Sequence, residues 1–227
     1  MSFDPTAVDT ITVDSYGTLV DPHSVEATLE EHVDEIRPIS TLWRSRSIMY
    51  TMVGNFVDDY QPFYEMNRDA LRFALESHGV DLTSETIEEI LSTYHDLDPF
   101  DDVRDGLETL TDAGYDVYVL SNGNPEMLES MVESADIEDV IADAISAHEI
   151  RTFKPDADIY RHAAARTGTP IESIAHVAGP TFDVRGAMHA GMQGVWINRD
   201  DGPWDPSATE PDLTVETFFD LTDELAG

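Results

Sequence analysis

Short apolar runs rich in β-branched residues recur along the chain, with amphipathic stretches between them. The five runs are residues 10–13, 115–120, 143–147, 173–178 and 194–197. An apolar run of this length, bounded by turn residues, is typical of a strand buried in a parallel sheet. Helical periodicity between the runs falls at 124–135, 156–168 and 182–191. The alternation predicts an α/β protein with a doubly wound parallel sheet.

The segment from residue 22 to residue 98 interrupts this alternation. It holds no convincing strand but four helical patterns, at 23–36, 40–56, 63–78 and 83–95. Because the segment follows the first strand, we expect an inserted helical cap seated over the carboxyl edge of the sheet, where doubly wound proteins have their active sites. The predicted domains are a catalytic core of residues 1–21 and 99–227 and a cap of residues 22–98.

The charge of the chain is strongly acidic. Its 227 residues include 47 acidic and 12 basic side chains, a formal net charge of -35, and the acids are spread along the whole length. Such a surface repels itself at ordinary ionic strength, whereas salt at about 1 M shortens the screening length to about 3 Å. We therefore expect a halophilic source. The same charge argues against binding to nucleic acid or anionic membranes, because both require Lys and Arg to meet phosphates.

The chain contains no cysteine, which excludes disulfides, thiolate catalysis and metal sites built on Cys. The first residues, MSFDPTAVDTITVD, lack a basic region followed by an apolar run. No apolar segment approaches the roughly 18 residues that a membrane-spanning helix needs. We therefore expect a soluble, cytoplasmic protein.

Polar residues that a buried core does not require stand at the ends of the predicted strands. Asp14 ends the first strand ahead of Gly17, Ser121 and Asn122 follow the second, and Asp183 follows the fourth. A carboxylate in such a place can act as a nucleophile, and hydroxyl, amide and helix-start N–H groups can hold an anion. Each residue also has an ordinary alternative as a helix cap or a turn residue.

Lys154, in the stretch EIRTFKPD, is the only lysine of the chain. Because this surface is solubilised by Asp and Glu, solubility does not explain a single lysine, and a compact ammonium is a group that Arg cannot supply. Pro155 fixes the chain directly after it, so the ammonium should project from a loop at the edge of the sheet. Beside Asp14, Ser121 and Asp183, it completes a set of nucleophile, anion cradle, neutralising cation and second carboxylate.

At these residues the chain resembles the haloacid dehalogenase superfamily, and within it the type II L-2-haloacid dehalogenases. The resemblance covers nearly the whole chain, through DSYGTLVD (14–21), LWRSRSIMYT (42–51), DALRFAL (69–75), LSNG (120–123), FKPD (153–156) and WINR (196–199). It implies a Rossmann-like core with an inserted helical cap. It also implies a hydrolase acting on carbon-halide bonds, with no metal or other cofactor, and by family habit a homodimer through cap or core helices.

The same resemblance implies a mechanism. Asp14 would attack the Cα of a short L-2-haloalkanoic acid and displace halide with inversion, and water would then release a D-2-hydroxy acid from the Asp14 ester. Arg44 of the cap would receive the halide, although a surface arginine balancing nearby acids is the alternative. Lys154 would steady the charge of Asp14.

The resemblance also assigns supporting residues. Those that would hold the substrate or the nucleophile are Thr18, Ser121 and Asn122. Those that would support Lys154 and the hydrolytic water are Tyr160 and Asp183. An apolar wall, for which plain core packing is an equal alternative, would come from Tyr16, Ile48, Phe63 and Phe182.

Two alternatives belong beside the dehalogenase interpretation. Phosphatases of the superfamily carry a second Asp where this chain has Tyr16, and a Mg²⁺-holding Asp where it has Pro180, so a Mg²⁺-dependent small-molecule phosphatase is disfavoured. A catalytically impaired homologue acting as a binding protein is the other alternative.

One departure from the family concerns the fourth loop. Family members place Ser and Asn at the positions of Ala178 and Pro180, where they orient the water and the nucleophilic Asp. Neither replacement has a side-chain hydrogen-bonding group. We therefore predict slow turnover, a different water position resting on Asp183, or an altered substrate.

Overall fold

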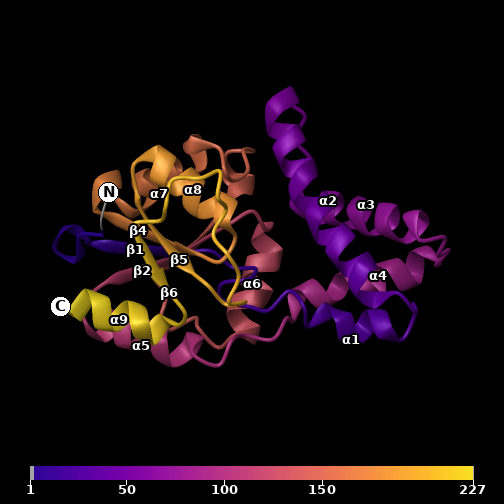
Figure 1. Ribbon diagram of the computed structural model, residues 1–227, viewed down its shortest axis with the longest axis horizontal. Coiled ribbons are helices and arrows are strands. Elements are labelled where there is room, and N and C mark those ends of the chain that lie inside the picture. Colours follow the sequence, from indigo (N-terminus) through magenta and orange to yellow (C-terminus); the bar gives the residue numbers. More distant parts are fainter. Residues whose placement is uncertain (1–2, 227) are drawn as a thin grey trace.

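Six parallel strands form one sheet in the part of the chain that the computed structural model describes, residues 3–226 (Figure 1). In chain order they are β1 (Thr10–Val13), β2 (Asp116–Ser121), β3 (Asp143–Ser146), β4 (Ile174–Ala178), β5 (Gln193–Ile197) and β6 (Leu213–Val215). Their order across the sheet is β3-β2-β1-β4-β5-β6. This is the doubly wound arrangement, so the predicted α/β class is confirmed.

The five predicted strands match β1 to β5 within two residues at either end. The sixth strand, β6, was not predicted, because it is only three residues long and one of them, Val215, is buried. A strand so short at the edge of a sheet leaves little apolar pattern in the sequence.

Helices cover both faces of the sheet. The core helices are α5 (Val103–Asp112), α6 (Pro125–Ser134), α7 (Ala157–Thr167), α8 (Thr181–Ala190) and α9 (Phe218–Ala226). Figure 1 shows α7 and α8 on one face and α5 and α9 on the other. The three predicted core helices correspond to α6, α7 and α8, while α5 and α9 were not predicted. The bounds of α7 follow from local chemistry, because Asp156 caps its first turn and Gly168 adopts a left-handed φ of 73° at its end.

The segment between β1 and α5 is helical, as predicted, and forms the second lobe in Figure 1. Its helices are α1 (Val25–Glu30), α2 (Ile36–Val57), α3 (Phe63–Ser77) and α4 (Ser84–Ser92), followed by a 3-10 turn at Thr93–His95. The first is shorter and the second longer than predicted. Pro38 lies in the first turn of α2, where a missing N–H breaks no helical hydrogen bond. We keep the name cap for this lobe, and the boundary at residues 22 and 98 stays a prediction; the predicted core also includes residues 1, 2 and 227, which lie outside the described residues.

The two chain connections between core and cap run side by side. The backbone N–H of Asp21 donates to the carbonyl of Asp98 at 2.8 Å, and that of Phe100 donates to the carbonyl of Leu19 at 3.0 Å. A second junction joins α2 to the loop before Lys154, because the Asn55 amide bonds both the N–H and the carbonyl of Phe153. These contacts seat the cap over the carboxyl edge of the sheet.

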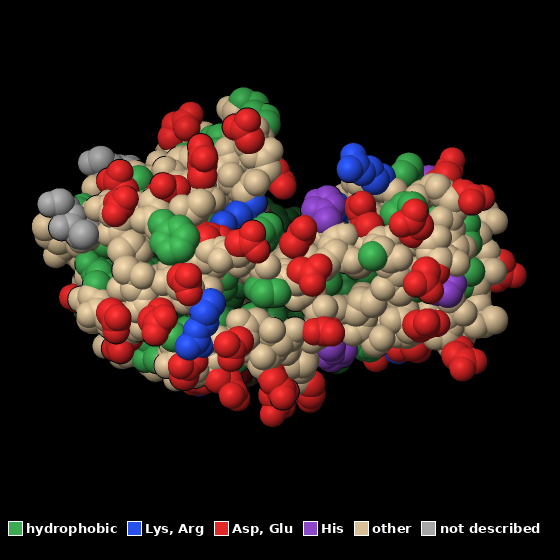
Figure 2. Space-filling view, turned by 90° about the horizontal axis from the view of Figure 1, so that it is seen from below, with side chains coloured by type: hydrophobic (Ala, Val, Ile, Leu, Met, Phe, Trp, Pro, Cys, Tyr) green, Lys and Arg blue, Asp and Glu red, His purple; other side chains and the backbone are tan. Residues whose placement is uncertain are grey.

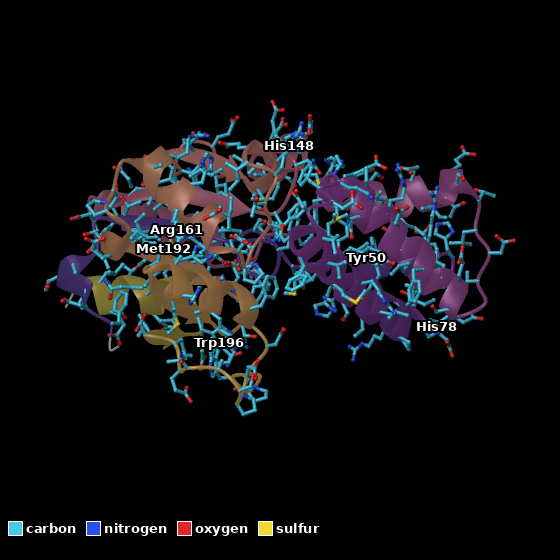
Figure 3. The ribbon with its side chains drawn as sticks, turned by 90° about the horizontal axis from the view of Figure 1, so that it is seen from above. Tyr50, His78, His148, Arg161, Met192 and Trp196 are labelled. Atoms are coloured by element: carbon cyan, nitrogen blue, oxygen red, sulfur yellow. The ribbon has the colours of Figure 1, made fainter. Side chains whose placement is uncertain are left out.

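His148 and Tyr60 form a third contact between the lobes. His148 lies at the junction of core and cap (Figure 3), where its Nδ1 is 2.7 Å from the Tyr60 hydroxyl. The surface around both lobes is acidic: Figure 2 shows Asp and Glu side chains scattered over the whole face in view, with few Lys or Arg. Among residues 3–226, no helix is long and apolar enough to cross a membrane.

Candidate active site

The candidate site lies where β1, β2 and β4 end at the same edge of the sheet. Val13 is level with Val119 of β2 on one side and with Val177 of β4 on the other. The next residues along the three strands therefore meet at one level. Because the chain leaves β1 and β4 in opposite directions across the sheet, a crevice opens between them, which is where doubly wound proteins bind ligands.

Asp14 is the first residue after β1, and both of its carboxylate oxygens are held. Lys154 Nζ lies 2.9 Å from Oδ1, and the Thr18 hydroxyl donates to Oδ2 over 3.1 Å. The turn that follows is tight, because Gly17 has a φ of 83°. A Cβ on Gly179 would lie 2.1 Å from the Gly17 carbonyl oxygen, so only glycine lets the loops after β1 and β4 approach so closely.

Lys154 is 1% exposed and stands between two carboxylates. Its ammonium donates to Asp14, to Asp183 Oδ2 at 2.7 Å and to the carbonyl of Leu120. An ammonium has three donors, so every one of them is used. The only lysine of the sequence is therefore a buried ion-pair partner and not a surface residue.

Asp183, in the first turn of α8, is fully buried behind Lys154. Its Oδ1 accepts from the Tyr160 hydroxyl at 2.7 Å and lies 3.0 Å from His176 Nε2. Its Oδ2 faces Lys154, so both oxygens have partners. Asp183 does not line the cavity described below, and a water resting on it stays a prediction.

The buried charges shift one another's pKa values. Burial raises the pKa of Asp14 and Asp183 raises it further, while Lys154 opposes both effects. For Asp183, burial also acts upward, but His176 and Lys154 outweigh it and hold the pKa well below its ordinary value. Burial acts to lower the pKa of Lys154, and the two carboxylates outweigh it and raise that pKa. As pH falls, Asp14 is therefore the carboxyl group that takes up a proton first.

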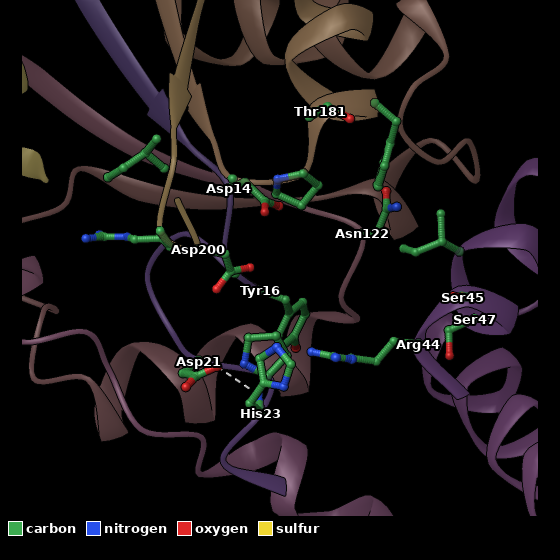
Figure 4. Close-up of a pocket in the computed structure, with 18 of the residues that line it drawn as sticks. Asp14, Tyr16, Asp21, His23, Arg44, Ser45, Ser47, Asn122, Thr181 and Asp200 are labelled. Carbon is green, nitrogen blue, oxygen red and sulfur yellow. Dashed lines mark hydrogen bonds between the residues drawn. The ribbon is translucent and has the colours of Figure 1, made fainter. Parts of the chain in front are cut away.

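A cavity of about 600 Å³ opens above Asp14 between core and cap (Figure 4). The predicted site residues that line it are Asp14, Tyr16, Arg44, Ile48, Phe63, Asn122, Lys154 and Phe182. The wall is largely apolar, and within it the rings of Tyr16 and Phe63 stack with centroids 6.2 Å apart. The cavity therefore offers a carboxylate floor under an apolar chamber.

Arg44 reaches from α2 into this cavity toward Tyr16 (Figure 4). Its guanidinium forms no hydrogen bond or ion pair with any other residue in 3–226. In a chain with 47 acidic residues, an arginine without a carboxylate partner that faces a cavity is suited to bind an anion.

Four predicted site residues lie behind the cavity and not in its lining: Thr18, Ser121, Tyr160 and Asp183. The Ser121 hydroxyl lies 2.6 Å from that of Ser15 and accepts from the N–H of Gly123, so it braces two loops. Thr18 accepts from the N–H of Gly179 at 2.9 Å while it donates to Asp14. These side chains orient other groups rather than reach the cavity.

Sequence reasoning missed two residues that touch this assembly. Arg199 lines the cavity, pairs with Asp102 at 2.7 Å and donates to the carbonyl of Thr18 at 2.9 Å. Arg199 stands in the motif WINR, but the family resemblance assigned it no role. His176 holds Asp183, and its signal was a lone histidine inside the apolar run SIAHVA.

The fourth loop brings no side-chain hydrogen-bonding group to the cavity from positions 178 and 180. Ala178 is buried at the end of β4, and Pro180 lines the cavity directly before α8. The N–H of Gly179 between them already donates to Thr18. The predicted loss of polar support therefore concerns these two positions, while the adjacent Thr181, which carries a hydroxyl, lines the cavity.

The sequence and the fold were compared with known proteins. The family description "haloacid dehalogenase-like hydrolase" matches residues 8–191. An (S)-2-haloacid dehalogenase of Pseudomonas putida is 32% identical over 216 residues, 95% of each chain. The (S)-2-haloacid dehalogenase 4A of Burkholderia cepacia is 33% identical over 191 residues, which cover 84% of this chain and 83% of the relative.

Two solved structures extend the similarity to the fold. The L-2-haloacid dehalogenase RSc1362 superposes with a TM-score of 0.93 at 29% identity, covering 97% of this chain and 99% of that one. The L-2-haloacid dehalogenase of Xanthobacter autotrophicus with chloropropionic acid covalently bound gives a TM-score of 0.89 at 25% identity over the same shares.

Proposed function

The chain belongs to the haloacid dehalogenase-like hydrolases, and within this family we propose that it is an (S)-2-haloacid dehalogenase. Its substrates are short L-2-haloalkanoic acids, its products are halide and D-2-hydroxy acids, and the reaction needs no metal. The observation that carries the proposal is the Asp14 carboxylate at the floor of an apolar cavity, with Lys154 on one oxygen and the unpaired Arg44 in the wall.

The first half of the reaction is an alkylation. An oxygen of Asp14 attacks the Cα of the substrate, the carbon–halogen bond breaks, and the halide takes the bonding electron pair. Each carboxylate oxygen carries two lone pairs, so one remains free beside the hydrogen bond from Lys154 or Thr18. Arg44 receives the halide, because its guanidinium forms no hydrogen bond or ion pair with a carboxylate of the described residues.

The second half is hydrolysis of the ester. Water adds to the Asp14 carbonyl carbon, the bond between that carbon and the ester oxygen breaks, and the hydroxy acid leaves with one of the two water protons. The other proton is released as the Asp14 carboxylate returns. Bare fourth-loop positions at Ala178 and Pro180 give this water no side-chain partner, so we propose that hydrolysis, not alkylation, limits turnover.

The remaining residues act as supports in this proposal. Lys154 steadies the charge of Asp14, Asp183 holds the Lys154 ammonium, and Tyr160 in turn holds Asp183. The Asn122 amide oxygen accepts from the backbone N–H of Lys154 at 2.9 Å. The residues that position neighbouring loops are Thr18 and Ser121, and the residues that shape the apolar wall are Tyr16, Ile48, Phe63 and Phe182.

Intact-mass spectrometry after mixing with L-2-chloropropionate, in high salt and without metal, tests the proposal. We expect an adduct of one propionate unit on Asp14 together with halide release, and Asp14→Asn should give neither. Asp21→Asn is the matched control, because Asp21 also lines the cavity but lies outside the buried charge cluster. Wild-type protein with no adduct and no halide from any L- or D-haloacid would reject the dehalogenase.

A phosphatase is not favoured, because Tyr16 and Pro180 stand where the phosphatases of this superfamily need carboxylates. Release of p-nitrophenol from its phosphate only when Mg²⁺ is added would reverse that preference. A binding protein without catalysis is rejected by the same halide assay, since such a protein has no activity for Asp14→Asn to remove.

We further propose a homodimer that uses α2. Met49, Val53, Phe56 and Val57 form one stripe of this helix by their spacing, and Phe56 is 93% exposed. Such a stripe on a projecting helix end is typical of an interaction surface (Figure 1). Light scattering in high salt should give twice the chain mass for the wild type, and the chain mass for Phe56→Asp.

The cytoplasmic, salt-adapted setting is also a proposal, supported by the acidic surface of both lobes. Thermal unfolding in a salt series should show stability rising with salt up to molar concentration. A protein equally stable at about 0.1 M salt would contradict a halophilic origin. The expected absence of nucleic-acid and membrane partners rests on charge alone.

A further inference from the structure

A histidine stands in the middle of the sheet, where the fold offers it no water. His176 is the third residue of β4 and its side chain is fully buried. Strands buried on both faces are normally apolar, so a polar side chain at this position needs partners. His176 has two: Nδ1 lies 2.9 Å from the Thr12 hydroxyl, and Nε2 lies 3.0 Å from Asp183 Oδ1.

Sheet register explains why these groups meet. Thr12 of β1 is the direct neighbour of His176 in the parallel ladder. Since side chains alternate between faces along a strand, Thr12 and Asp14 share one face of β1. His176 therefore lies on the face of the sheet that carries the nucleophile, one step deeper in the core.

The contacts connect His176 to Asp14 without a gap. His176 meets Asp183 Oδ1, Asp183 Oδ2 meets Lys154 at 2.7 Å, and Lys154 meets Asp14 at 2.9 Å. Tyr160 of α7 closes the remaining side, with its ring edge-on to the imidazole at 5.6 Å and its hydroxyl on the same carboxylate. These are the titratable and charged groups that face His176 from the elements around it.

Proton positions in this line are fixed by the partners. An ionised carboxylate only accepts, so the imidazole must carry a hydrogen on Nε2 to bond Asp183. In the neutral ring, Nδ1 is then an acceptor, and the Thr12 hydroxyl can donate to it. Thr12 thus selects the ring orientation in which Nε2–H points at Asp183.

We propose that His176 is a positioning residue for Asp14: its Nε2–H holds Asp183 so that the second carboxylate oxygen fixes Lys154 against the nucleophile. The inference deepens the proposed dehalogenase and rests on it for its kinetic readout. Without the Nε2–H donor, Asp183 retains Tyr160 on one oxygen but loses a bond that sets its rotation. The Asp183 carboxylate then no longer fixes the position of the Lys154 ammonium, and the Asp14 carboxylate loses its fixed geometry.

Three variants at one position separate the donor from the bulk of the ring. In His176→Gln the amide nitrogen can replace Nε2 and reach Asp183. In His176→Asn the shorter amide reaches only the Nδ1 position, near Thr12. In His176→Phe a ring of similar size carries no donor at all. His162→Phe, a change at a histidine paired with Glu149 away from the cavity, is the matched control.

The kinetic readout is kcat/KM for halide release from L-2-chloropropionate. We expect about a 10- to 100-fold loss for His176→Phe and His176→Asn, the usual effect of removing a hydrogen bond to a charged group. Both His176→Gln and the control His162→Phe should stay within about threefold of wild type. The inference is overturned if His176→Gln loses as much activity as His176→Phe, or if His176→Phe or His176→Asn stays within about threefold of wild type.

A second readout needs no substrate. Asp183 has a pKa depressed by His176 and Lys154, so it stabilises the fold above the pKa of an unfolded Asp, about 4, and this stability is lost as pH falls through the folded value. The loss of stability of His176→Phe and His176→Asn relative to wild type should therefore be largest near neutral pH and become smaller toward acid pH. A deficit that is the same at every pH would mean a packing role only and would overturn the inference. If the wild type releases no halide, the proposed function fails, while this series still decides the role of His176.

Discussion

Strands β1 and β4 are neighbours in the sheet, and the segments that follow them line the same cavity. After β1, Asp14 is held by Lys154 and Thr18. After β4, positions 178 and 180 offer a methyl group and a proline ring, and Asp183 in the first turn of α8 is buried with a donor on each oxygen. Hydrogen bonds therefore fix the Asp14 carboxylate, whereas positions 178 and 180 of the fourth loop offer no side-chain hydrogen bond to a water.

This difference separates the two halves of the proposed reaction. Alkylation needs an oriented carboxylate and a place for the halide, and both are present. Ester hydrolysis needs an oriented water, and positions 178 and 180 offer it no side-chain hydrogen-bonding group. Perturbing each region separately tests whether the two halves depend on different regions.

The largest expected effect comes from removing the cation of the floor. Lys154→Met leaves Asp14 and Asp183 buried without their shared partner, which should lower the free energy of unfolding by about 3 to 5 kcal/mol. Denaturant unfolding in high salt measures it. Arg161→Met, which breaks an exposed pair with Asp158, should change stability by no more than about 0.5 kcal/mol. Equal losses of unfolding free energy for the two variants would show that the buried cation stabilises the fold no more than an exposed one.

The next effect concerns the halide site of the cap. Arg44→Met should lower kcat/KM for halide release by about 100- to 1,000-fold, the usual range for removing a donor that stabilises developing charge. Arg44→Lys should recover part of it, since a charge remains without the planar fork. Arg46, two residues further along α2 and stacked on Phe73, is the control. If Arg44→Met and Arg46→Met have equal effects, the leaving group is not received by Arg44.

The pH dependence of alkylation tests the protonation state of Asp14 without mutation. Protonated Asp14 cannot attack, and burial raises its pKa above the ordinary value of about 4. The rate of adduct formation should therefore fall about tenfold per pH unit below a midpoint that lies above pH 4. Rapid-quench mass spectrometry in high salt provides the rates. A midpoint at or below 4 would mean that Lys154 outweighs burial at Asp14.

The smallest expected effect is a faster ester hydrolysis when polar side chains are introduced into the fourth loop. The double variant Ala178→Ser, Pro180→Asn restores the polar groups of the family, and we expect ester hydrolysis to rise by about tenfold while alkylation stays unchanged. Single-turnover decay of the Asp14 adduct measures the step. Val177→Ile, a buried change without a hydrogen-bonding group, is the control. No acceleration in the double variant would mean that another group already orients the water.

Several elements were readable from the sequence because their patterns are local. Strands β1 to β5 and helices α6 to α8 follow from apolar runs, periodicity and caps within a few residues. Helix α5 was not predicted, although its buried residues Val103, Leu107 and Leu110 have helical spacing. Strand β6 is too short to have a pattern, and only its pairing with β5 defines it.

The site was readable in part for the same reason. Asp14 and Lys154 were predicted because each conflicts with its local setting, as a polar residue at a strand end and as the only lysine of an acidic chain, whereas Arg44 was predicted from the family resemblance alone. Whether a residue reaches the cavity could not be predicted from the sequence. Ser121, Asn122 and Asp183 all stand at or just beyond strand ends, yet of these three only Asn122 lines the cavity.

The sequence by itself determined the alternating sheet, the inserted helices, the identity of the charged residues and the missing polar groups at positions 178 and 180. Only the tertiary structure decided which of them share one buried volume. The single lysine meets two carboxylates from β1 and α8, and a histidine from β4 meets one of them, because parallel strands in register end at one edge. Periodicity acts over a few residues, whereas these contacts join residues up to 140 positions apart, and only packing of the sheet brings them together.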